Sequence, residues 1–359
     1  MIDLLFSVVV PVYNVEAFLE ACLASLKHQS CQDFEIIIVN DGSSDSSSLL
    51  YKEFVAKNPQ LSIKIVEQPN RGLLGARRAG FQQATGDYIV SLDGDDELRF
   101  DALEIIQSAI ESSSADVVCF ELSTTKDFSL NKNRVAFLTE QVFLGRRRAE
   151  FIREFCLHGK LNSMVKKAIR RSILDVDNDY SEFGRTNYGE DALQSLAVYD
   201  AARSIHYLPE ALYYYRLNNG SITQRFDKSQ FDDLVKIRMA IYDIATSWQT
   251  RFAIPDLLDC VDMNTIRATC AYCQRVSRAL GVDSAIEPLK AASESDLFIA
   301  AMKNERARAM LRMDMRVLST ILDKGWYHSF SLLAICKETV AGFRSRAFNP
   351  TPSAKRQRK

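Results

Sequence analysis

Three aspartates follow a short apolar run within four positions of the chain, at Asp93, Asp95 and Asp96. The run itself, residues 88–92, has the length and the bounding glycines that are typical of a buried strand. Its acidic end is then expected at the carboxyl edge of a sheet, where open α/β sheets bind their ligands. Carboxylates this close raise one another's pKa unless a cation compensates them, so the pattern suits Mg²⁺ or Mn²⁺ held together with substrate phosphates. The alternative is a polar turn before a helix that starts near Asp101.

Strands and helices alternate along the first third of the chain, and this alternation has to position those aspartates. It predicts an α/β fold, with a mainly parallel sheet and helices on both of its faces. The predicted strands are continuously apolar, as buried parallel strands should be. They cover residues 4–10, 34–41, 62–66, 88–92 and 116–120, and the intervening helices cover about 15–27, a segment after 42–45, a segment from 70 to 85, and 101–113.

This topology brings the ends of the first, second and fourth strands to one edge of the sheet. Tyr13, Asp41 and the pair Asp93 and Asp95 would then face a common crevice, which is the expected position for a nucleotide. Tyr13 can stack on a base, Asp41 can accept hydrogen bonds from base or ribose, and Arg77 can reach a phosphate. Each residue also has a purely structural interpretation. Tyr13 would be a half-buried aromatic, Asp41 a turn residue and Arg77 a solvated charge on a helix.

The composition is that of a globular protein with room for two domains, since 47% of the 359 residues are hydrophobic and 25% are charged. The eight cysteines are scattered through apolar segments, and no secretory signal precedes the first strand, so we expect a reducing, cytoplasmic setting. Cys270 and Cys273 have the spacing of half a zinc site, but no second pair follows them, and we expect no zinc there.

The charge is unevenly distributed, although the formal net charge is only −1. Residues 344–359 hold six basic and no acidic residues, which leaves 39 basic and 46 acidic residues in the rest of the chain. Such a tail is either a solvated end or a segment attracted to anionic lipid, by about 1 kcal/mol for each Lys or Arg near the surface. No apolar run approaches the roughly 20 residues that span a bilayer, so any membrane contact should be peripheral, at the inner face of the cell membrane. Nucleic-acid binding is not expected, because the acidic body lacks a basic face interleaved with aromatics.

Several motifs together resemble the family 2 glycosyltransferases of the GT-A fold, of the type that builds bacterial cell-surface polysaccharide. The motifs follow that family's order and spacing, and the resemblance covers about residues 5–225. They lie at residues 8–14, 39–45, 70–80 and 91–96, and they continue at 188–191, 208–216 and 221–223.

The resemblance implies an inverting transfer of a sugar from a nucleotide diphosphate donor, usually a UDP-sugar. Asn40, where a second acid is common, and Arg78, where Asn is usual, depart from the family and leave the donor's identity more open. The resemblance also implies a role for each matching residue: base contacts for Pro11, Tyr13 and Asp41, nucleotide binding for Arg77, ribose binding for Asp93 and metal binding for Asp95.

The resemblance further implies that Asp191 is the catalytic base, because an acceptor hydroxyl must lose its proton as it attacks the sugar. A helix is predicted from Asp191 to about residue 201, and its dipole would favour an ionised carboxylate there. An ordinary helix cap is the alternative interpretation. Glu190, Arg216 and Ser221 are expected on the acceptor or diphosphate side.

Residues 121–187 contain a predicted strand at 137–144 and a basic amphipathic segment. The resemblance places this region on the acceptor side, where its charges either meet an anionic acceptor or form a solvated helix face. The segment contains Lys160, Lys166, Lys167, Arg170 and Arg171.

Helical periodicity dominates after residue 226. We therefore expect a nucleotide-sugar-binding and catalytic domain over residues 1–225, an all-helical region over 226–345 and a basic tail over 346–359. Trp326, Tyr327 and Phe343 could form an interfacial membrane face.

The sequence thus predicts a metal-dependent inverting glycosyltransferase that uses a nucleotide-sugar donor, with UDP as the expected nucleotide, and a glycan or lipid-linked glycan acceptor. Two alternatives stay open. A nucleotidyltransferase also uses acids on a nucleotide-binding α/β sheet but releases pyrophosphate. A sugar-nucleotide-binding scaffold would bind the donor without transferring the sugar.

Overall fold

The computed structural model describes residues 5–130, 135–176, 180, 189–217, 227 and 229–336. The chain divides into two units by its internal contacts. The first unit comprises Met1–Arg225 with Lys236–Leu257, and the second comprises Phe226–Val235 with Leu258–Lys359.

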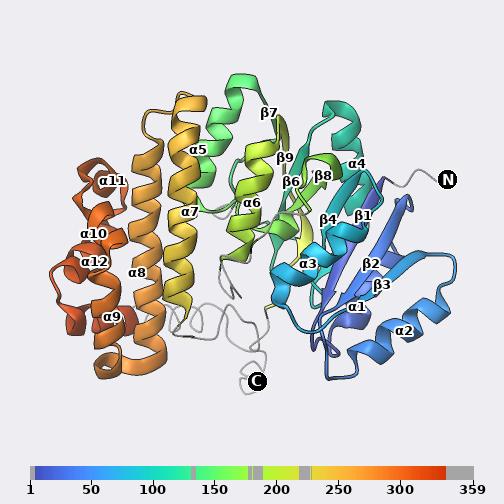
Figure 1. The fold of residues 1–359 in the computed structure, drawn as a ribbon, viewed down its shortest axis with the longest axis horizontal. Coiled ribbons are helices and arrows are strands. Elements are labelled where there is room, and N and C mark those ends of the chain that lie inside the picture. Colours follow the sequence, from blue (N-terminus) through green and yellow to red (C-terminus); the bar gives the residue numbers. More distant parts are fainter. Residues whose placement is uncertain are drawn as a thin grey trace, which may run out of the picture. The chain divides into compact units, whose positions relative to one another are not determined.

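The described part of the first unit is organised on a nine-stranded mixed sheet (Figure 1). Its order is β3-β2-β1-β4-β8-β6-β9-β5, and β7 also pairs with β9. The strands are β1 (Phe6–Val12), β2 (Phe34–Asn40), β3 (Ser62–Glu67), β4 (Tyr88–Ser91), β5 (Glu97–Leu98), β6 (Val117–Ser123), β7 (Gln141–Leu144), β8 (Lys167–Arg170) and β9 (Ser204–Tyr214).

The first four strands, β3, β2, β1 and β4, are all parallel, as the alternation of strands and helices predicts. Beyond β4 the sheet departs from the mainly parallel prediction. The short strand β8 lies antiparallel between β4 and β6, and β5 and β7 run antiparallel to β9. The sequence pattern did not indicate β8, because its four residues begin with Lys167 and end with Arg170 and so lack a continuous apolar run.

Helices cover both faces of this sheet. The helices α1 (Leu19–Lys27) and α4 (Ala102–Ser113) share a hydrophobic cluster with Val8 and Val10 of β1. The helix α3 (Gly72–Gln83) packs against β1 and β2, where the neighbouring side chain of Val9 points to the opposite face. The other helices of this unit are α2 (Ser47–Lys57), α5 (Arg148–His158), α6 (Glu190–Ala201) and, from residue 236 on, α7 (Gln230–Arg251).

The described part of the second unit is helical, as predicted. It contains the start of α7, followed by α8 (Leu257–Ser284), α9 (Ile286–Ser293), α10 (Asp296–Lys303), α11 (Glu305–Met310), α12 (Met313–Asp323) and helical residues 327–336. Cys270 and Cys273 are buried free cysteines within α8. Among the residues described, no helix has the length and apolar character that crossing a membrane requires. Phe343 and the tail 346–359 lie outside the described residues.

Candidate functional site

The ends of β1, β2 and β4 carry the residues that the topology was expected to bring together. Pro11 lies near the end of β1, and its carbonyl oxygen accepts a hydrogen bond from the Gly94 amide at 3.2 Å. A Cβ atom at position 94 would come within 2.9 Å of that same oxygen. Glycine is therefore required between Asp93 and Asp95, because only a residue without a side chain lets the turn after β4 pack this tightly against β1.

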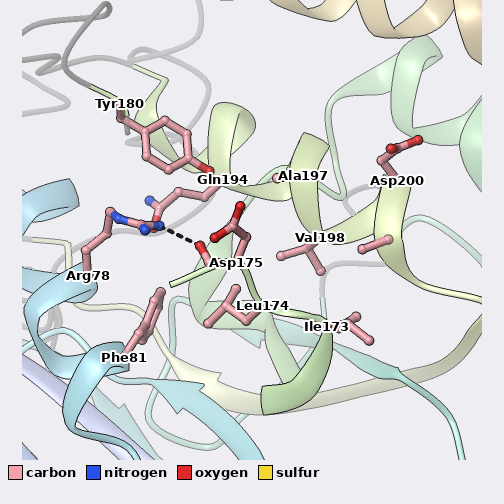
Figure 2. Close-up of a pocket in the computed structure, with 11 residues that line it drawn as sticks. Arg78, Phe81, Ile173, Leu174, Asp175, Tyr180, Gln194, Ala197, Val198 and Asp200 are labelled. Atoms are coloured by element: carbon pink, nitrogen blue, oxygen red, sulfur yellow. Dashed lines mark hydrogen bonds between the residues drawn. The ribbon is translucent and has the colours of Figure 1, made fainter. Parts of the chain in front are cut away.

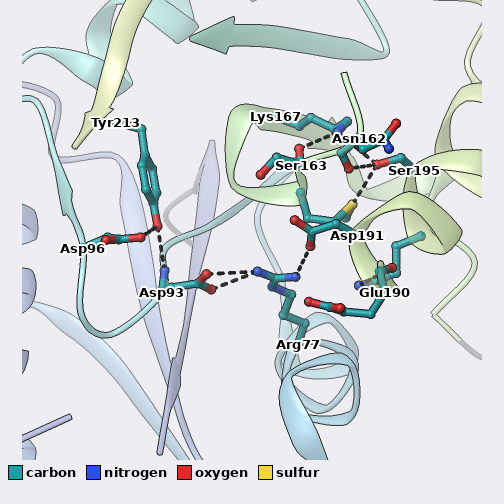
Figure 3. Close-up of polar contacts among 12 residues, drawn as sticks. Arg77, Asp93, Asp96, Asn162, Ser163, Lys167, Glu190, Asp191, Ser195 and Tyr213 are labelled. Atoms are coloured by element: carbon teal, nitrogen blue, oxygen red, sulfur yellow. Dashed lines mark hydrogen bonds and ion pairs between the residues drawn. The ribbon is translucent and has the colours of Figure 1, made fainter. Parts of the chain in front are cut away.

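Arg77, on α3, connects Asp93 to Asp191 (Figure 3). Its Nη2 atom donates to both carboxylate oxygens of Asp93, at 3.0 and 3.2 Å, and its Nη1 atom donates to Oδ1 of Asp191 at 2.5 Å. The Arg77 side chain is only 1% exposed. The guanidinium thus joins two carboxylates that the sequence separates by almost one hundred residues.

The charges around Arg77 shift the pKa of several groups. Burial by itself would lower the pKa of Arg77, but the charges of Asp93, Asp191 and Glu190 outweigh it and raise the pKa. Burial also raises the pKa of Asp93, and the charges of Asp191 and Asp95 add to this effect against the opposing charge of Arg77. Negative charge therefore exceeds positive charge at this edge of the sheet.

Glu190 and Asp191 form the first turn of α6. The preceding residue, Gly189, has φ +84°, and a Cβ atom there would lie 2.4 Å from Cδ1 of Ile237. A glycine is needed at this position for both reasons, and it sets the direction in which α6 begins. Burial, followed by the charge of Asp191, raises the pKa of Glu190 to about 7, although Arg77 opposes the shift. Glu190 therefore changes its charge near neutral pH.

Asp96 is buried behind the Asp93 and Asp95 pair. Its carboxylate accepts hydrogen bonds from the Tyr213 hydroxyl at 2.6 Å and from the Arg216 amide at 2.7 Å. Burial first, and then the charges of Asp93 and Asp95, raise the pKa of Asp96 to about 8. Sequence reasoning placed Asp96 in the acidic cluster but gave it no role of its own, and it did not assign Tyr213 to the site. The position of Asp96 directly after Asp95 was the available indication of its role. No local pattern indicated Tyr213.

Arg216, which was expected on the acceptor or diphosphate side, lies beside this acidic turn. Its Nε atom donates to the Asp95 carbonyl oxygen at 2.9 Å, and its guanidinium pairs with Glu97 at 2.5 Å. Ser221, the other residue expected there, lies outside the described residues.

Asp41 and Tyr13 differ sharply in exposure. Asp41 is buried, and its carboxylate accepts hydrogen bonds from the Gln68 side chain and from the amides of Arg71 and Gly72, at 2.7 to 2.9 Å. It therefore anchors the start of α3, the helix that carries Arg77. Tyr13 is 47% exposed, so its ring is open to a ligand.

Asn40, which departs from the family pattern, has a structural partner. Its Nδ2 atom donates to Glu67 at 2.7 Å, and its Oδ1 atom accepts from the Ser43 amide. Glu67 also accepts a hydrogen bond from the Tyr51 hydroxyl. An aspartate at position 40 would place a second negative charge against Glu67. The neutral asparagine avoids this repulsion.

Two lysines of the basic segment lie in the protein interior, whereas Lys160 and Arg170 are half-buried and Arg171 is exposed. Lys166 is buried and pairs with Glu121. Lys167, only 1% exposed, donates to the carbonyl oxygens of Leu161 and Ser163 and to the hydroxyl of Ser195 on α6 (Figure 3). The interpretation as a solvated helix face was wrong for these two lysines, because they meet partners that are remote in the sequence, which allows them to be buried.

The acidic turn suits a divalent cation. Asp93 and Asp95 supply hard carboxylate oxygens, and after burial their negative charges help to raise the pKa of Asp96, an effect that a cation would oppose. No described group of three or more His, Cys, Asp and Glu side chains is arranged to hold a metal by itself. Mg²⁺ and Mn²⁺ sites built from one or two carboxylates, water and substrate phosphates do not need such a group, so the residues present fit the ion.

Comparison with known proteins adds to this geometry. Residues 7–175 match the model of the family described as glycosyl transferase family 2. A putative glycosyltransferase of Bacillus subtilis, EpsH, is 29% identical over 228 residues, which are 63% of this chain and 64% of that protein. The chain thus spans somewhat less than two thirds of that relative.

Two solved structures share the fold. The structure of residues 1–349 of Staphylococcus aureus TarS in complex with UDP-GlcNAc matches with a TM-score of 0.64 and 18% identity, over 94% of this chain and 92% of that one. The mannosyltransferase PcManGT of Pyrobaculum calidifontis, in complex with GDP-Man and Mn²⁺, matches with a TM-score of 0.50 and 16% identity, over 92% of this chain and 86% of that one. At these identities the similarity concerns the fold alone.

Proposed function

Because the chain belongs to glycosyl transferase family 2 and has the GT-A fold, we propose that it transfers a sugar from a nucleotide diphosphate donor to a hydroxyl group of a glycan or lipid-linked glycan, with inversion at the anomeric carbon. The observation that carries this proposal is that one guanidinium, that of Arg77, pairs with both Asp93 and Asp191. In such a transfer, the donor-binding carboxylate and the base must lie on either side of the sugar. Asp93 and Asp191 lie on either side of the Arg77 side chain.

UDP is the proposed nucleotide. Tyr13 is exposed at the end of β1 and can stack on a base, and Pro11, Asp41 and Asp93 line the same edge of the sheet. The TarS complex contains UDP-GlcNAc and the PcManGT complex contains GDP-Man, so sugar nucleotides of two kinds bind to proteins of this fold. Of uracil and guanine, the family resemblance favours uracil as the base of this chain's donor.

Asp95 is the proposed ligand of the divalent ion. When bound, Mn²⁺ or Mg²⁺ would supply Lewis-acid stabilisation of the negative charge that develops on the nucleotide diphosphate. Arg216 would add a second positive group, because its guanidinium lies against the Asp95 carbonyl oxygen. Arg216 is held in place by Glu97 and by packing against the rings of Phe18 and Tyr214.

Asp191 is the proposed base. It would accept the proton of the acceptor hydroxyl as that oxygen attacks the sugar, a role typically worth 10²- to 10⁴-fold in rate. It lies in the first turn of α6, and Arg77 fixes its orientation through Oδ1. Oδ2 of Asp191 has no hydrogen bond to Arg77, and it is the oxygen that we assign to proton transfer.

Product analysis tests this proposal. The protein would be incubated with Mn²⁺ and UDP-GlcNAc, UDP-glucose or UDP-galactose, and released UDP would be measured. A parallel incubation with Mn²⁺, UTP and a sugar 1-phosphate would measure released pyrophosphate. We expect UDP from at least one donor, slowly with water and faster with a suitable glycan. Release of pyrophosphate would identify a nucleotidyltransferase. Tight binding of UDP without release from any donor or acceptor would identify a scaffold. Either result would overturn the proposal.

A further inference from the structure

A hollow of the first unit, of about 190 Å³, lies between α3, α6 and the 3₁₀ turn Arg171–Ile173 with the residues after it (Figure 2). It is distinct from the acidic turn, because neighbouring arginines of α3 point to different places. Arg77 contacts Asp93 and Asp191, whereas Arg78 donates to the Asp175 carbonyl oxygen at 3.1 Å and stacks on the ring of Tyr180 at 5.1 Å.

Two buried polar atoms at this hollow have no hydrogen-bond partner among the residues that the structure describes. One is a donor, Nη2 of Arg78, and the other is an acceptor, Oε1 of Gln194. Gln194 is only 3% exposed, and its Nε2 atom already donates to the Glu190 carbonyl oxygen at 3.3 Å, which fixes the orientation of the amide. Leaving a buried polar atom unsatisfied is energetically costly, so the pair indicates a group that both accepts and donates.

Asp175, Tyr180 and Asp200 also line the hollow, but the rest of its wall beyond Arg78 and Gln194 is apolar (Figure 2). A water cluster would meet few partners there, since a buried water needs two to four polar groups. A ligand with a hydroxylated edge and an apolar face satisfies both sides. The apolar wall consists of Phe81, Ile173, Leu174, Ala197, Val198 and Ala201.

The charges favour a neutral ligand over an anion. Arg78 brings one positive charge, but Asp175 and Asp200 also line the hollow. Asp200 is bound by the Trp248 indole at 2.7 Å and by Arg251 at 2.7 Å. The local balance therefore leaves no excess positive charge to attract a phosphate or a carboxylate.

We infer that this hollow binds one neutral sugar residue, whose hydroxyl accepts from Arg78 and donates to Gln194. The volume is below the roughly 300–1,000 Å³ of pockets that hold drug-sized ligands, so it accommodates a single ring. Gln194 lies three residues after Asp191 on α6, which places the hollow one helical turn from the proposed base. Resting on the proposed function, we assign the bound sugar to the acceptor glycan. Arg78 thereby gains a role at a position where the family resemblance implies asparagine.

Saturation-transfer NMR tests this site with glucose, galactose, mannose, N-acetylglucosamine and, as the charged probe, glucuronate. UDP and Mn²⁺ would be present to occupy the donor side. We expect at least one neutral sugar to bind to the wild type, and its signal to fall at least fivefold in Gln194→Leu and in Arg78→Met. Gln83→Leu, at an exposed position of α3, is the matched control and should behave as the wild type. The half-buried Arg78 offers a second test if Gln194→Leu does not fold.

Three outcomes would overturn the inference: no binding of any neutral sugar, binding of glucuronate alone, or neutral-sugar signals that both variants leave unchanged. Release of UDP from donor by the wild type is measured in a separate assay. The site can therefore fail while the proposed function holds, and the proposed function can fail while the sugar site is confirmed.

Discussion

The Nη1 atom of Arg77 lies 2.5 Å from Oδ1 of Asp191, and Nη2 of the same guanidinium lies 3.0 Å from Oδ1 of Asp93. A buried cation between two carboxylates keeps them close without mutual repulsion. The same contact ties α6 to the end of β4 through α3. Arg77 therefore has both a structural and a chemical role, and the two roles can be separated by experiment.

Replacement of Arg77 by Met should destabilise the fold. It leaves Asp93 and Asp191 facing each other without their shared cation. We expect the free energy of unfolding to fall by about 3 kcal/mol, the lower end of the cost of breaking a buried pair. The lower end applies because both carboxylates keep some contact with solvent. Urea denaturation measures this change. The double variant Arg77→Met, Asp191→Asn should lose less than the sum of the single variants, because one of the repelling charges is then absent. Additive losses would argue against the bridge.

Replacement of Asp191 by Asn should lower sugar transfer by 10²- to 10⁴-fold, because the amide cannot accept the proton of the acceptor hydroxyl. Donor binding should persist, since Arg77 keeps its contacts with Asp93. The turnover number and the Kd for UDP would be measured together. A variant that transfers sugar at the wild-type rate would exclude Asp191 as the base.

Replacement of Asp95 by Asn should reduce donor turnover by about 100-fold, which corresponds to the several kcal/mol that a metal ion contributes. The reduction should be smaller when Mn²⁺ is raised to high concentration, because the variant weakens binding of the ion. Asp243→Asn, at an exposed position of α7, provides the matched control. Equal dependence on Mn²⁺ in both variants and the wild type would contradict a metal site at Asp95.

Glu190 should give the stability a distinct pH dependence. Its pKa is about 7 in the folded protein, whereas the ordinary value for a glutamate is about 4.5. Between these two pH values the folded state therefore binds more protons than the unfolded state. Stability from this group is therefore full below about pH 4.5 and is lost as the pH rises to about 7, by at most about 1.4 kcal/mol per pH unit. Glu190→Gln should remove this slope. An identical slope in the variant, measured by thermal denaturation from pH 4.5 to 8, would show that another group is responsible.

Lys167 should give the opposite slope at higher pH. Burial lowers its pKa from 10.5 to about 8, so the unfolded state binds more protons between these values and stability rises with pH in that window. Lys167→Met should abolish the rise. It should also cost about 2 kcal/mol, since the carbonyl oxygens of Leu161 and Ser163 lose their donor. Lys57→Met on the surface of α2 serves as control, and a similar loss there would refute a special role for Lys167.

The amino-acid sequence by itself determined the types of the main elements and the positions of the acidic residues at their ends. The strands β1, β2 and β4 were predictable because a continuous apolar run is a local property, and Asp41, Asp93 and Asp95 follow these runs directly. The start of α6 at Glu190 and the helical character after residue 226 were predictable for the same reason.

Which of these residues meet depends on the folded arrangement of the chain. Arg77 and Asp191 are 114 positions apart, and no local pattern indicates that they share a hydrogen bond. The insertion of β8 between β4 and β6, the burial of Lys167 and the hydrogen bond from Tyr213 to Asp96 likewise depend on partners far along the chain. A charged side chain becomes a surface group or a buried, paired one according to what the fold places against it, and that proximity exists only once the chain has folded.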